Sequence, residues 1–134
     1  MRLFLILLFI SLPAHANYKW KVTDVVDGDT INIEMRKLPK ELSMKVRVYG
    51  IDTPEHGWRA KCDSERELAK QAKEFTAKVI NDAKKVYFTD VKWDKYGGRV
   101  VAKTFVDGQD LSQLLIEKGL ARPYFGDKKL GWCD

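Results

Sequence analysis

The chain has 134 residues, of which 45% are hydrophobic and 32% are charged, and its formal net charge at pH 7 is +5. This length suits one small domain, and the composition is that of a globular rather than a disordered protein. The positive charge favours polyanionic partners such as nucleic acid or anionic lipid. Because many exported proteins are basic, the charge alone selects no partner.

The N-terminal residues have the pattern of a secretory signal peptide. Arg2 supplies a positive charge, residues 3–12 are apolar, and Ala14-His15-Ala16 presents small residues at the spacing that a signal peptidase reads. We therefore expect cleavage after Ala16, one mature domain over residues 17–134, export from the cytoplasm and no membrane attachment afterwards. An uncleaved anchor is the alternative, but the apolar run is too short to span a bilayer comfortably.

Alternating apolar and polar residues predict the first strands. Residues 18–34 read as a hairpin that turns at Asp27-Gly28-Asp29. Residues 36–43 are charged and contain a proline, which predicts a loop. Residues 45–51 then read as a third strand, ended by Thr53-Pro54 because proline cannot continue the hydrogen-bond ladder.

A long helix is predicted to follow an irregular segment at residues 56–63. Ser64 and Glu67 have the spacing of a capping box at its start. Lys84 and Lys85 are expected in its last turn, where cations suit the helix dipole. One helical face carries the apolar residues Leu68, Ala72, Phe75, Val79 and Ala83.

Two further strands and a second helix complete the pattern. Residues 86–93 and 100–106 read as strands joined by a turn at residues 94–98. Asp110 is expected to cap the second helix and Gly119 to end it. Three strands, a helix, two strands and a helix suit an α+β fold: a five-stranded Greek-key β-barrel of the OB type with two or three helices. Such barrels commonly bind oligonucleotides, but fold alone does not fix function.

The two cysteines, Cys62 and Cys133, are expected to pair. An even number of cysteines in an exported chain indicates a disulfide. A loop of this size would contribute about 4 kcal/mol in the chain-entropy model. Two unpaired thiols are the alternative. A structural zinc site is not expected, because the mature chain adds only His56 and has no C-x-x-C pair.

Polar residues that can carry chemistry gather at three places. They are Asp27-Gly28-Asp29-Thr30, Arg47 with Asp52-Thr53-Pro54-Glu55, and Asp94-Lys95-Tyr96-Gly97-Gly98-Arg99. Carboxylates at strand ends that face each other repel, and a calcium ion coordinated by carboxylate and carbonyl oxygens would relieve that repulsion. Asp29 and Asp52 could supply the charges and the Thr53 carbonyl a neutral oxygen. The alternative for Asp27 and Asp29 is ordinary turn chemistry.

Two arginines near these carboxylates favour a phosphate-binding site over ordinary turn chemistry. Arg47 lies in an otherwise apolar strand, and Arg99 follows a double glycine that lets backbone approach a ligand closely. A guanidinium binds phosphate through a planar, permanently charged fork. A metal, two arginines and a carboxylate meet the needs of phosphoryl transfer. The alternatives are a salt-bridged strand arginine for Arg47 and a solvated turn arginine for Arg99.

These motifs together resemble the staphylococcal nuclease (thermonuclease) family. The matching segments are residues 25–31, 47–55, 94–99 and 119–121, in the family's order, and the resemblance covers nearly all of residues 18–125. It implies a calcium-dependent nuclease that cleaves the 5′ P–O bond of DNA and RNA, leaves 3′-phosphates and prefers single-stranded or frayed segments. A monomer is the default expectation, which the sequence does not test.

The resemblance also implies roles for individual residues. Asp29, Asp52 and the carbonyl of Thr53 would hold calcium, with Asp27 behind them, and Glu55 would orient or deprotonate the attacking water.

On the substrate side, Arg47 and Arg99 would clamp the phosphate and stabilise the transition state. Lys95, Tyr96 and Tyr124 could flank the groove, where aromatic rings stack on bases without reading sequence. Packing in the barrel rim is the alternative for the two tyrosines.

Three basic residues of the loop after Glu55, namely His56, Arg59 and Lys61, could contact substrate backbone, with a solvated loop as the alternative. The glycine doublet before Arg99 replaces a single glycine of the family pattern, so it could shift this arginine. Two other classes stay open: a catalytically silent nucleic-acid-binding module of the OB type, and a calcium-binding structural module. The presence of both arginines and Glu55 beside the two aspartates favours catalysis.

Overall fold

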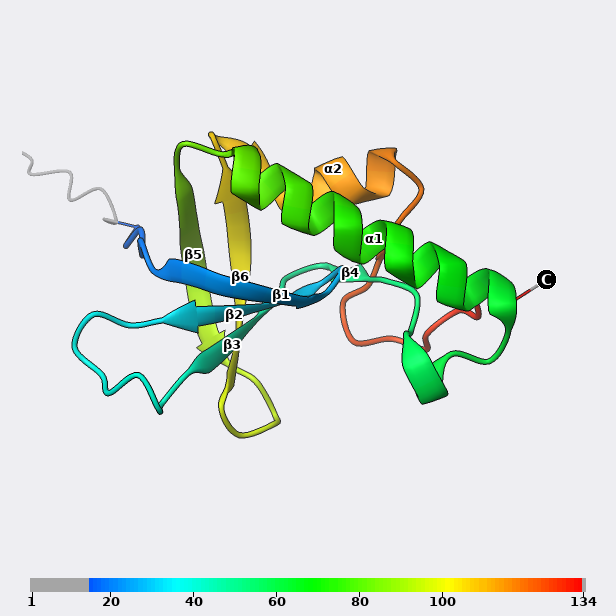
Figure 1. Ribbon diagram of the computed structural model, residues 1–134, viewed down its shortest axis with the longest axis horizontal. Coiled ribbons are helices and arrows are strands. Elements are labelled where there is room, and N and C mark those ends of the chain that lie inside the picture. Colours follow the sequence, from blue (N-terminus) through cyan, green and yellow to red (C-terminus); the bar gives the residue numbers. More distant parts are fainter. Residues whose placement is uncertain (1–14, 134) are drawn as a thin grey trace, which may run out of the picture.

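The computed structural model describes residues 15–133. The predicted signal peptide lies almost wholly outside these residues and stays a prediction. No helix in the described part of the chain is long and apolar enough to cross a membrane. The architecture is the expected α+β one: a strongly curled sheet with two helices packed along one end (Figure 1).

One mixed sheet forms the barrel wall. Its strand order is β1-β2-β3-β6-β5, with the short β7 paired to β6; β3 and β6 run parallel and the other pairs antiparallel. Tyr18 and Phe88 form an isolated two-bond bridge that joins the segment before β1 to β5, so the two edges of the sheet meet and the OB-type prediction is confirmed. The bounds are β1 Lys21–Asp27, β2 Thr30–Glu34, β3 Met44–Val48, β5 Val86–Trp93, β6 Arg99–Val106 and β7 Gln109–Asp110.

The predicted hairpin is present, and its turn is pressed against the long helix. A Cβ at Gly28 would lie 2.7 Å from the Cβ of Ala72 and 2.9 Å from the Cγ2 of Thr53. The Thr76 hydroxyl also donates to the Gly28 carbonyl over 2.8 Å. A glycine is therefore required here by close approach of the helix, and this contact fixes where the turn sits. The hairpin begins at Lys21 rather than residue 18, because Tyr18 pairs with β5 instead.

The third strand is shorter than predicted. β3 ends at Val48, and the chain turns at Gly50, which has a φ of 84°. Ile51–Asp52 then forms a separate strand, β4, that pairs with β8 (Arg122–Pro123) rather than with the main sheet. This turn carries Asp52 away from the direction of β3 and buries it beside the C-terminal segment.

The long helix α1 spans Asp63–Asp82, so the predicted capping box is wrong. Ser64 lies inside the first turn, and Cys62 occupies the N-cap without a side-chain cap hydrogen bond. Buried Glu65 instead holds the loop before the helix: its carboxylate accepts from the backbone N–H of Lys61 (2.7 Å) and of Glu55 (3.2 Å).

The C-terminal end of α1 also differs from the prediction. Ala83 is already extended, so Lys84 and Lys85 lie beyond the helix. Their backbone N–H groups donate to the carboxylate of Asp107, over 3.2 Å and 2.9 Å. The deepest face of α1 is Ala69, Ala72, Thr76 and Ile80, and the predicted apolar stripe lies half-buried at its margin apart from Ala72.

The remaining elements follow the prediction. Helix α2 spans Leu111–Glu117; the Asp110 side chain accepts from the Ser112 N–H (2.9 Å), and Gly119, with φ 70°, lies just past its end. A short 3-10 turn, η1 (Gly57–Arg59), interrupts the segment predicted to be irregular.

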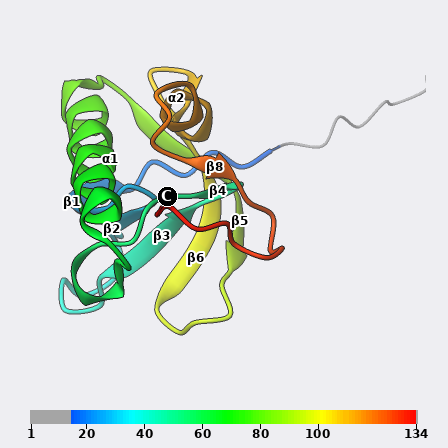
Figure 2. The same cartoon turned by 90° about the vertical axis from the view of Figure 1, so that its right-hand side faces the viewer.

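Cys62 and Cys133 form the expected disulfide. It holds the C-terminal segment beside the N-terminal end of α1, where both views place it (Figures 1 and 2).

Candidate active site

The three polar clusters of the sequence meet at one face of the barrel. The β1–β2 turn, the β3–β4 region and the β5–β6 turn line a single open pocket of about 710 Å³, which the C-terminal segment borders on its remaining side. Its lining includes the following predicted site residues: Asp27, Asp29, Arg47, Thr53, Glu55, Arg59, Lys95, Tyr96, Arg99 and Tyr124. Asp52 is buried beside the pocket without lining it.

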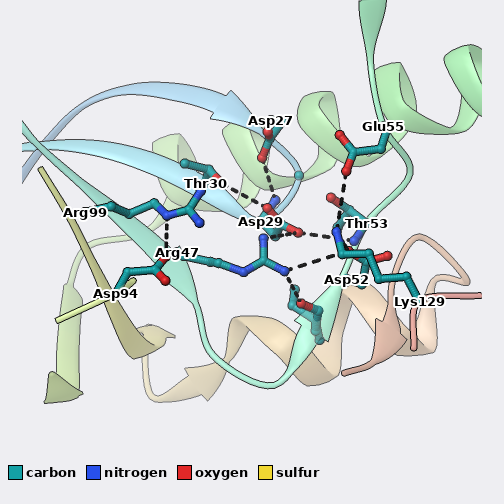
Figure 3. Close-up of polar contacts among 12 residues, drawn as sticks. Asp27, Asp29, Thr30, Arg47, Asp52, Thr53, Glu55, Asp94, Arg99 and Lys129 are labelled. Carbon is teal, nitrogen blue, oxygen red and sulfur yellow. Dashed lines mark hydrogen bonds and ion pairs between the residues drawn. The ribbon is translucent and has the colours of Figure 1, made fainter. Parts of the chain in front are cut away.

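Arg47 lies in the middle of the acidic cluster, which consists of Asp27, Asp29, Asp52 and Glu55 (Figure 3). Its Nη1 lies 3.0 Å from Asp29 Oδ2, and its Nη2 lies 3.7 Å from Asp52 Oδ1. Nη2 also donates to the Ile51 carbonyl over 3.1 Å. Burial lowers the pKa of Arg47, but the charges of Asp29, Asp52 and Asp27 outweigh it and raise the pKa above its usual range. The guanidinium is therefore a permanent, rigidly held charge.

Asp29 is held by groups from three segments. Its Oδ1 accepts from the Thr30 hydroxyl (2.9 Å), and its Oδ2 accepts from the Thr53 backbone N–H (3.2 Å) and pairs with Arg47. The Asp29 carbonyl accepts from the Val48 N–H (2.8 Å), which ties the β1–β2 turn to β3. A carboxylate held this firmly is preorganised to bind a cation or a donor.

Asp27 lies behind Asp29, in an environment that disfavours its charged form. Burial, followed by the negative charge of Asp29, raises the pKa of Asp27 from 3.8 to about 7. Its Oδ1 accepts from the Asp29 N–H (3.2 Å), and its Oδ2 lies 3.7 Å from His56 Nε2. The raised pKa reports burial first and then the crowding of negative charge at the β1–β2 turn.

Lys129 was not predicted as a site residue, yet it lies directly on the acidic cluster. Its Nζ is 2.6 Å from Asp52 Oδ1 and 3.4 Å from Glu55 Oε1 (Figure 3). Burial lowers the pKa of Lys129, but the hydrogen bond and charge of Asp52, with the charge of Glu55, raise it overall. The one sequence feature that pointed to this placement was the expected Cys62–Cys133 disulfide, which joins the C-terminal segment to the middle of the chain.

Glu55 stands at the mouth of the pocket, with its side chain 36% exposed. Its Oε2 lies 3.5 Å from Arg59 Nε, and its backbone N–H is held by Glu65. Of the loop residues, Arg59 lines the pocket, while Lys61 bonds through its backbone N–H to Glu65. Glu55 is thus fixed by its backbone while its carboxylate reaches water.

Arg99 enters the pocket at the start of β6, from the side of the β5–β6 turn. Its Nε pairs closely with Asp94 Oδ2, and its guanidinium lies 4.8 Å from the centre of the Tyr96 ring. Lys95 Nζ lies 5.2 Å from the same ring centre. The glycine doublet therefore does not remove Arg99 from the pocket. In Figure 3, Arg99 and Glu55 lie on opposite sides of Asp29.

The aromatic rim extends beyond the predicted residues. Tyr124 lines the pocket with its ring 5.6 Å from Lys129 Nζ. Phe125 packs edge-on against Tyr49, with ring centroids 5.7 Å apart, and both also line the pocket. Sequence reasoning missed these two rings because hydrophobic residues near strand ends usually read as core.

The acidic residues fit a hard divalent cation. The donor set of Asp29 and Asp52 carboxylates with the Thr53 carbonyl consists of oxygen atoms, which calcium prefers. Asp52 Oδ1 is buried, and its partners among the described residues are the charged groups of Lys129 and Arg47. A buried carboxylate oxygen is expensive unless a cation lies beside it. Lys129 supplies that charge here, and a divalent cation in its place would satisfy the same oxygen.

Comparison with known proteins gives two kinds of match. The family described as staphylococcal nuclease homologue matches residues 45–131. The chain is 27% identical over 127 residues to micrococcal nuclease of Shigella flexneri, across 89% of this chain and 66% of that protein. It is 31% identical over 140 residues to an uncharacterized protein of Methanocaldococcus jannaschii, across 89% and 65%. The chain thus spans about two thirds of the length of each relative.

Proposed function

The chain belongs to the family of staphylococcal nuclease homologues, and from that premise we propose that it is a calcium-dependent phosphodiesterase acting on DNA and RNA. We expect 3′-phosphate products and a preference for single-stranded or frayed substrate. One observation carries the proposal: Asp29, Arg47, Glu55 and Arg99, from separate segments, line a single open pocket.

Asp29, Asp52 and the carbonyl of Thr53 would hold the calcium ion. When bound, the ion would supply positive charge that neutralises the phosphate and acidifies water. Asp29 is already fixed by Thr30 and by the Thr53 N–H, so its carboxylate needs little reorganisation to act. Asp27 lies behind this set with a pKa raised by burial to about 7, so it would add negative charge that attracts a divalent cation only once it has lost its proton, above that pH.

Arg47 and Arg99 would bind the scissile phosphate from two sides. Each guanidinium is held by a carboxylate, Arg47 by Asp29 and Arg99 by Asp94, so its direction is set before substrate arrives. N–H groups not used in those pairs can donate to phosphate oxygens. Charge that develops on the equatorial oxygens of the transition state would strengthen both contacts.

Glu55 would take the proton of the attacking water. Its carboxylate is the most accessible of the cluster, and its backbone N–H is anchored to buried Glu65. A base that is exposed to water but fixed at its backbone suits proton transfer in hydrolysis.

The rim of the pocket suits an unstacked strand. Tyr96 and Tyr124 offer ring faces and Lys95 a positive charge beside the arginines. Rings of this kind stack on any base, so the contact supplies affinity without sequence preference. A duplex would have to open before its bases reached them, and we therefore expect single-stranded or frayed nucleic acid to be the better substrate.

A plasmid-nicking assay tests the proposal. Purified protein should nick and degrade plasmid DNA with calcium and lose that activity in chelator, and end-group analysis should find 3′-phosphates. The second candidate is a catalytically silent nucleic-acid-binding module, favoured by the ion pair that already occupies Asp52. In that case the DNA would be shifted in a gel but stay intact. Calcium binding with neither cleavage nor a shift would indicate a structural module.

We propose that the protein is exported and works as a monomer. The support for export is the N-terminal pattern of Arg2, the apolar run and Ala14-His15-Ala16, together with a disulfide that suits an oxidising compartment. N-terminal sequencing of exported protein should begin at Asn17, and sedimentation should give the mass of one chain.

A further inference from the structure

The proposed calcium ligands, namely Asp29, Asp52 and the Thr53 carbonyl, form what we call the cation cradle. The C-terminal segment, residues 124–133, places Lys129 directly against it. We propose that Lys129 is a tethered ammonium that competes with the divalent cation for Asp52 and Glu55, and that the Cys62–Cys133 disulfide keeps it there. The inference rests on the proposed function, because it concerns the same carboxylates. It makes Lys129 a residue that sets how much cation the protein needs.

The contacts of Asp52 carry the first step. Asp52 Oδ1 is buried, and Lys129 Nζ at 2.6 Å is its nearest cation, with Arg47 Nη2 farther away at 3.7 Å. A divalent cation on that oxygen would stand beside a positive ammonium. Two like charges so close repel strongly in a partly buried site. The cation and Lys129 therefore cannot share Asp52 as it stands, and one has to leave.

Glu55 adds a second contact that the cation would break. Its Oε1 lies 3.4 Å from Lys129 Nζ, while its Oε2 faces Arg59. Lys129 thus bridges a proposed metal ligand and the proposed general base. Movement of Lys129 away from the cradle would also release one oxygen of Glu55 toward water.

The second step is the tether. Arg122 Nη1 donates to the Gly131 carbonyl over 2.6 Å, and its guanidinium stacks on the Trp132 ring at 4.0 Å. Cys133 is bonded to Cys62, four residues beyond Lys129. At the other end, the Tyr124 N–H donates to the Gly50 carbonyl (2.8 Å). A segment held at both ends gives its ammonium a high effective concentration at Asp52.

Calcium titration by calorimetry, without nucleic acid, tests the competition. Lys129→Ala should bind calcium about five- to tenfold more tightly than the unaltered protein, and Lys129→Arg, which keeps the charge, should stay close to it. Lys128→Ala is the matched control, since it removes a neighbouring lysine that makes no ion pair among the described residues. Unchanged or weaker binding by Lys129→Ala would overturn the inference.

The tether is tested by a second set of variants. Cys62→Ser/Cys133→Ser should move calcium affinity toward that of Lys129→Ala, and adding these changes to Lys129→Ala should raise affinity no further. If circular dichroism shows that the double variant does not fold, Arg122→Ala, which loosens the segment with the disulfide intact, takes its place. Affinity equal to that of the unaltered protein would overturn the part assigned to the disulfide if the folded double variant shows it, and the part assigned to the held segment if Arg122→Ala shows it.

The two proposals fail differently. If no variant binds calcium, the calcium-dependent function is wrong, and the competition inferred from it is wrong as well. If the unaltered protein and Lys129→Ala bind calcium equally well, the function stands and only the role of Lys129 is wrong.

Discussion

At the scale of single residues, the site is a balance of buried charge. Three aspartates crowd the β1–β2 turn and β4, and Arg47 and Lys129 offset them at 3.0 Å and 2.6 Å. Removing one partner from such a cluster leaves a buried charge uncompensated, which typically costs about 3–5 kcal/mol. Substitutions of Arg47 therefore change stability as well as chemistry, and Glu55 is the cleaner probe of mechanism.

Glu55→Gln should separate turnover from folding. The side chain is partly exposed and its contacts with Arg59 and Lys129 lie at 3.5 Å and 3.4 Å, so we expect little change in melting temperature. Loss of the base should lower kcat by about 100-fold or more, with KM for DNA nearly unchanged. Steady-state kinetics and a thermal melt measure the two effects. Near-normal kcat would place the base elsewhere.

Asp27→Asn should change how stability depends on pH. The pKa of Asp27 rises from 3.8 to about 7 on folding, by burial and then the charge of Asp29. The folded state therefore keeps a proton that the unfolded state releases, so this stabilisation is complete below about pH 4 and is lost as the pH rises to about 7. The asparagine variant lacks that loss.

In chelator, its free energy of unfolding should exceed that of the unaltered protein by a few kcal/mol, on the order of the linkage limit, at pH 8 and should match it near pH 4. Urea titrations at the two pH values measure the difference. His56→Gln serves as the control, because His56 lies 3.7 Å from Asp27 and its removal separates an effect of that contact from the titration of Asp27. Parallel curves for Asp27→Asn and the unaltered protein would contradict the expectation.

At the scale of elements, the helix α1 positions the site from behind. Its N-terminal turn holds Glu55 through Glu65, and its middle holds the β1–β2 turn through Thr76 and the close approach to Gly28. The β1–β2 turn, which carries Asp29, and Glu55 are therefore both positioned by one rigid helix. A change at the helix–turn contact should shift Asp29 relative to Glu55.

Gly28→Ala should destabilise the fold by about 1–3 kcal/mol, because its Cβ would lie 2.7 Å from that of Ala72. Gly97→Ala is the matched control: it also lies in a turn beside the pocket, and a Cβ there would meet nothing within 4 Å. Denaturant unfolding of the two variants gives the comparison. Equal stability of Gly28→Ala and the unaltered protein would mean that the helix yields at no cost.

At the scale of the whole molecule, the disulfide and the strand bridge complete a small barrel. Tyr18 joins the sheet edges through Phe88, and Cys133 returns the chain end to Cys62 across 71 positions of sequence. The C-terminal segment thereby becomes one wall of the pocket. Its removal would open the site and expose Asp52.

Cys62→Ser/Cys133→Ser should lower the free energy of unfolding by about 4 kcal/mol, the chain-entropy value for a loop of this length. Equilibrium denaturation of oxidised protein and the double variant measures it, with m-values compared to detect a change in the unfolded state. A loss below about 1 kcal/mol would show that the tail is held by Arg122 and its partners instead.

Much of this protein could be predicted from the amino-acid sequence. Local patterns identified the order of elements, the second helix between Asp110 and Gly119, and the cysteine pair. Three polar motifs pointed to Asp29, Arg47 and Arg99, and those residues line one pocket; their catalytic roles stay predictions. These features depend on neighbours in the chain or on residue types with few alternatives.

Only the tertiary structure decided the rest. Lys129 reaches Asp52 across 77 positions of chain, and Glu65 rather than Glu67 holds the loop before α1 because Glu55 and Lys61 present their N–H groups to it. Gly28 is required by a helix far along the sequence. Local propensity cannot report such contacts, since their free energy comes from burial and charge between distant segments, which exist only once the barrel closes.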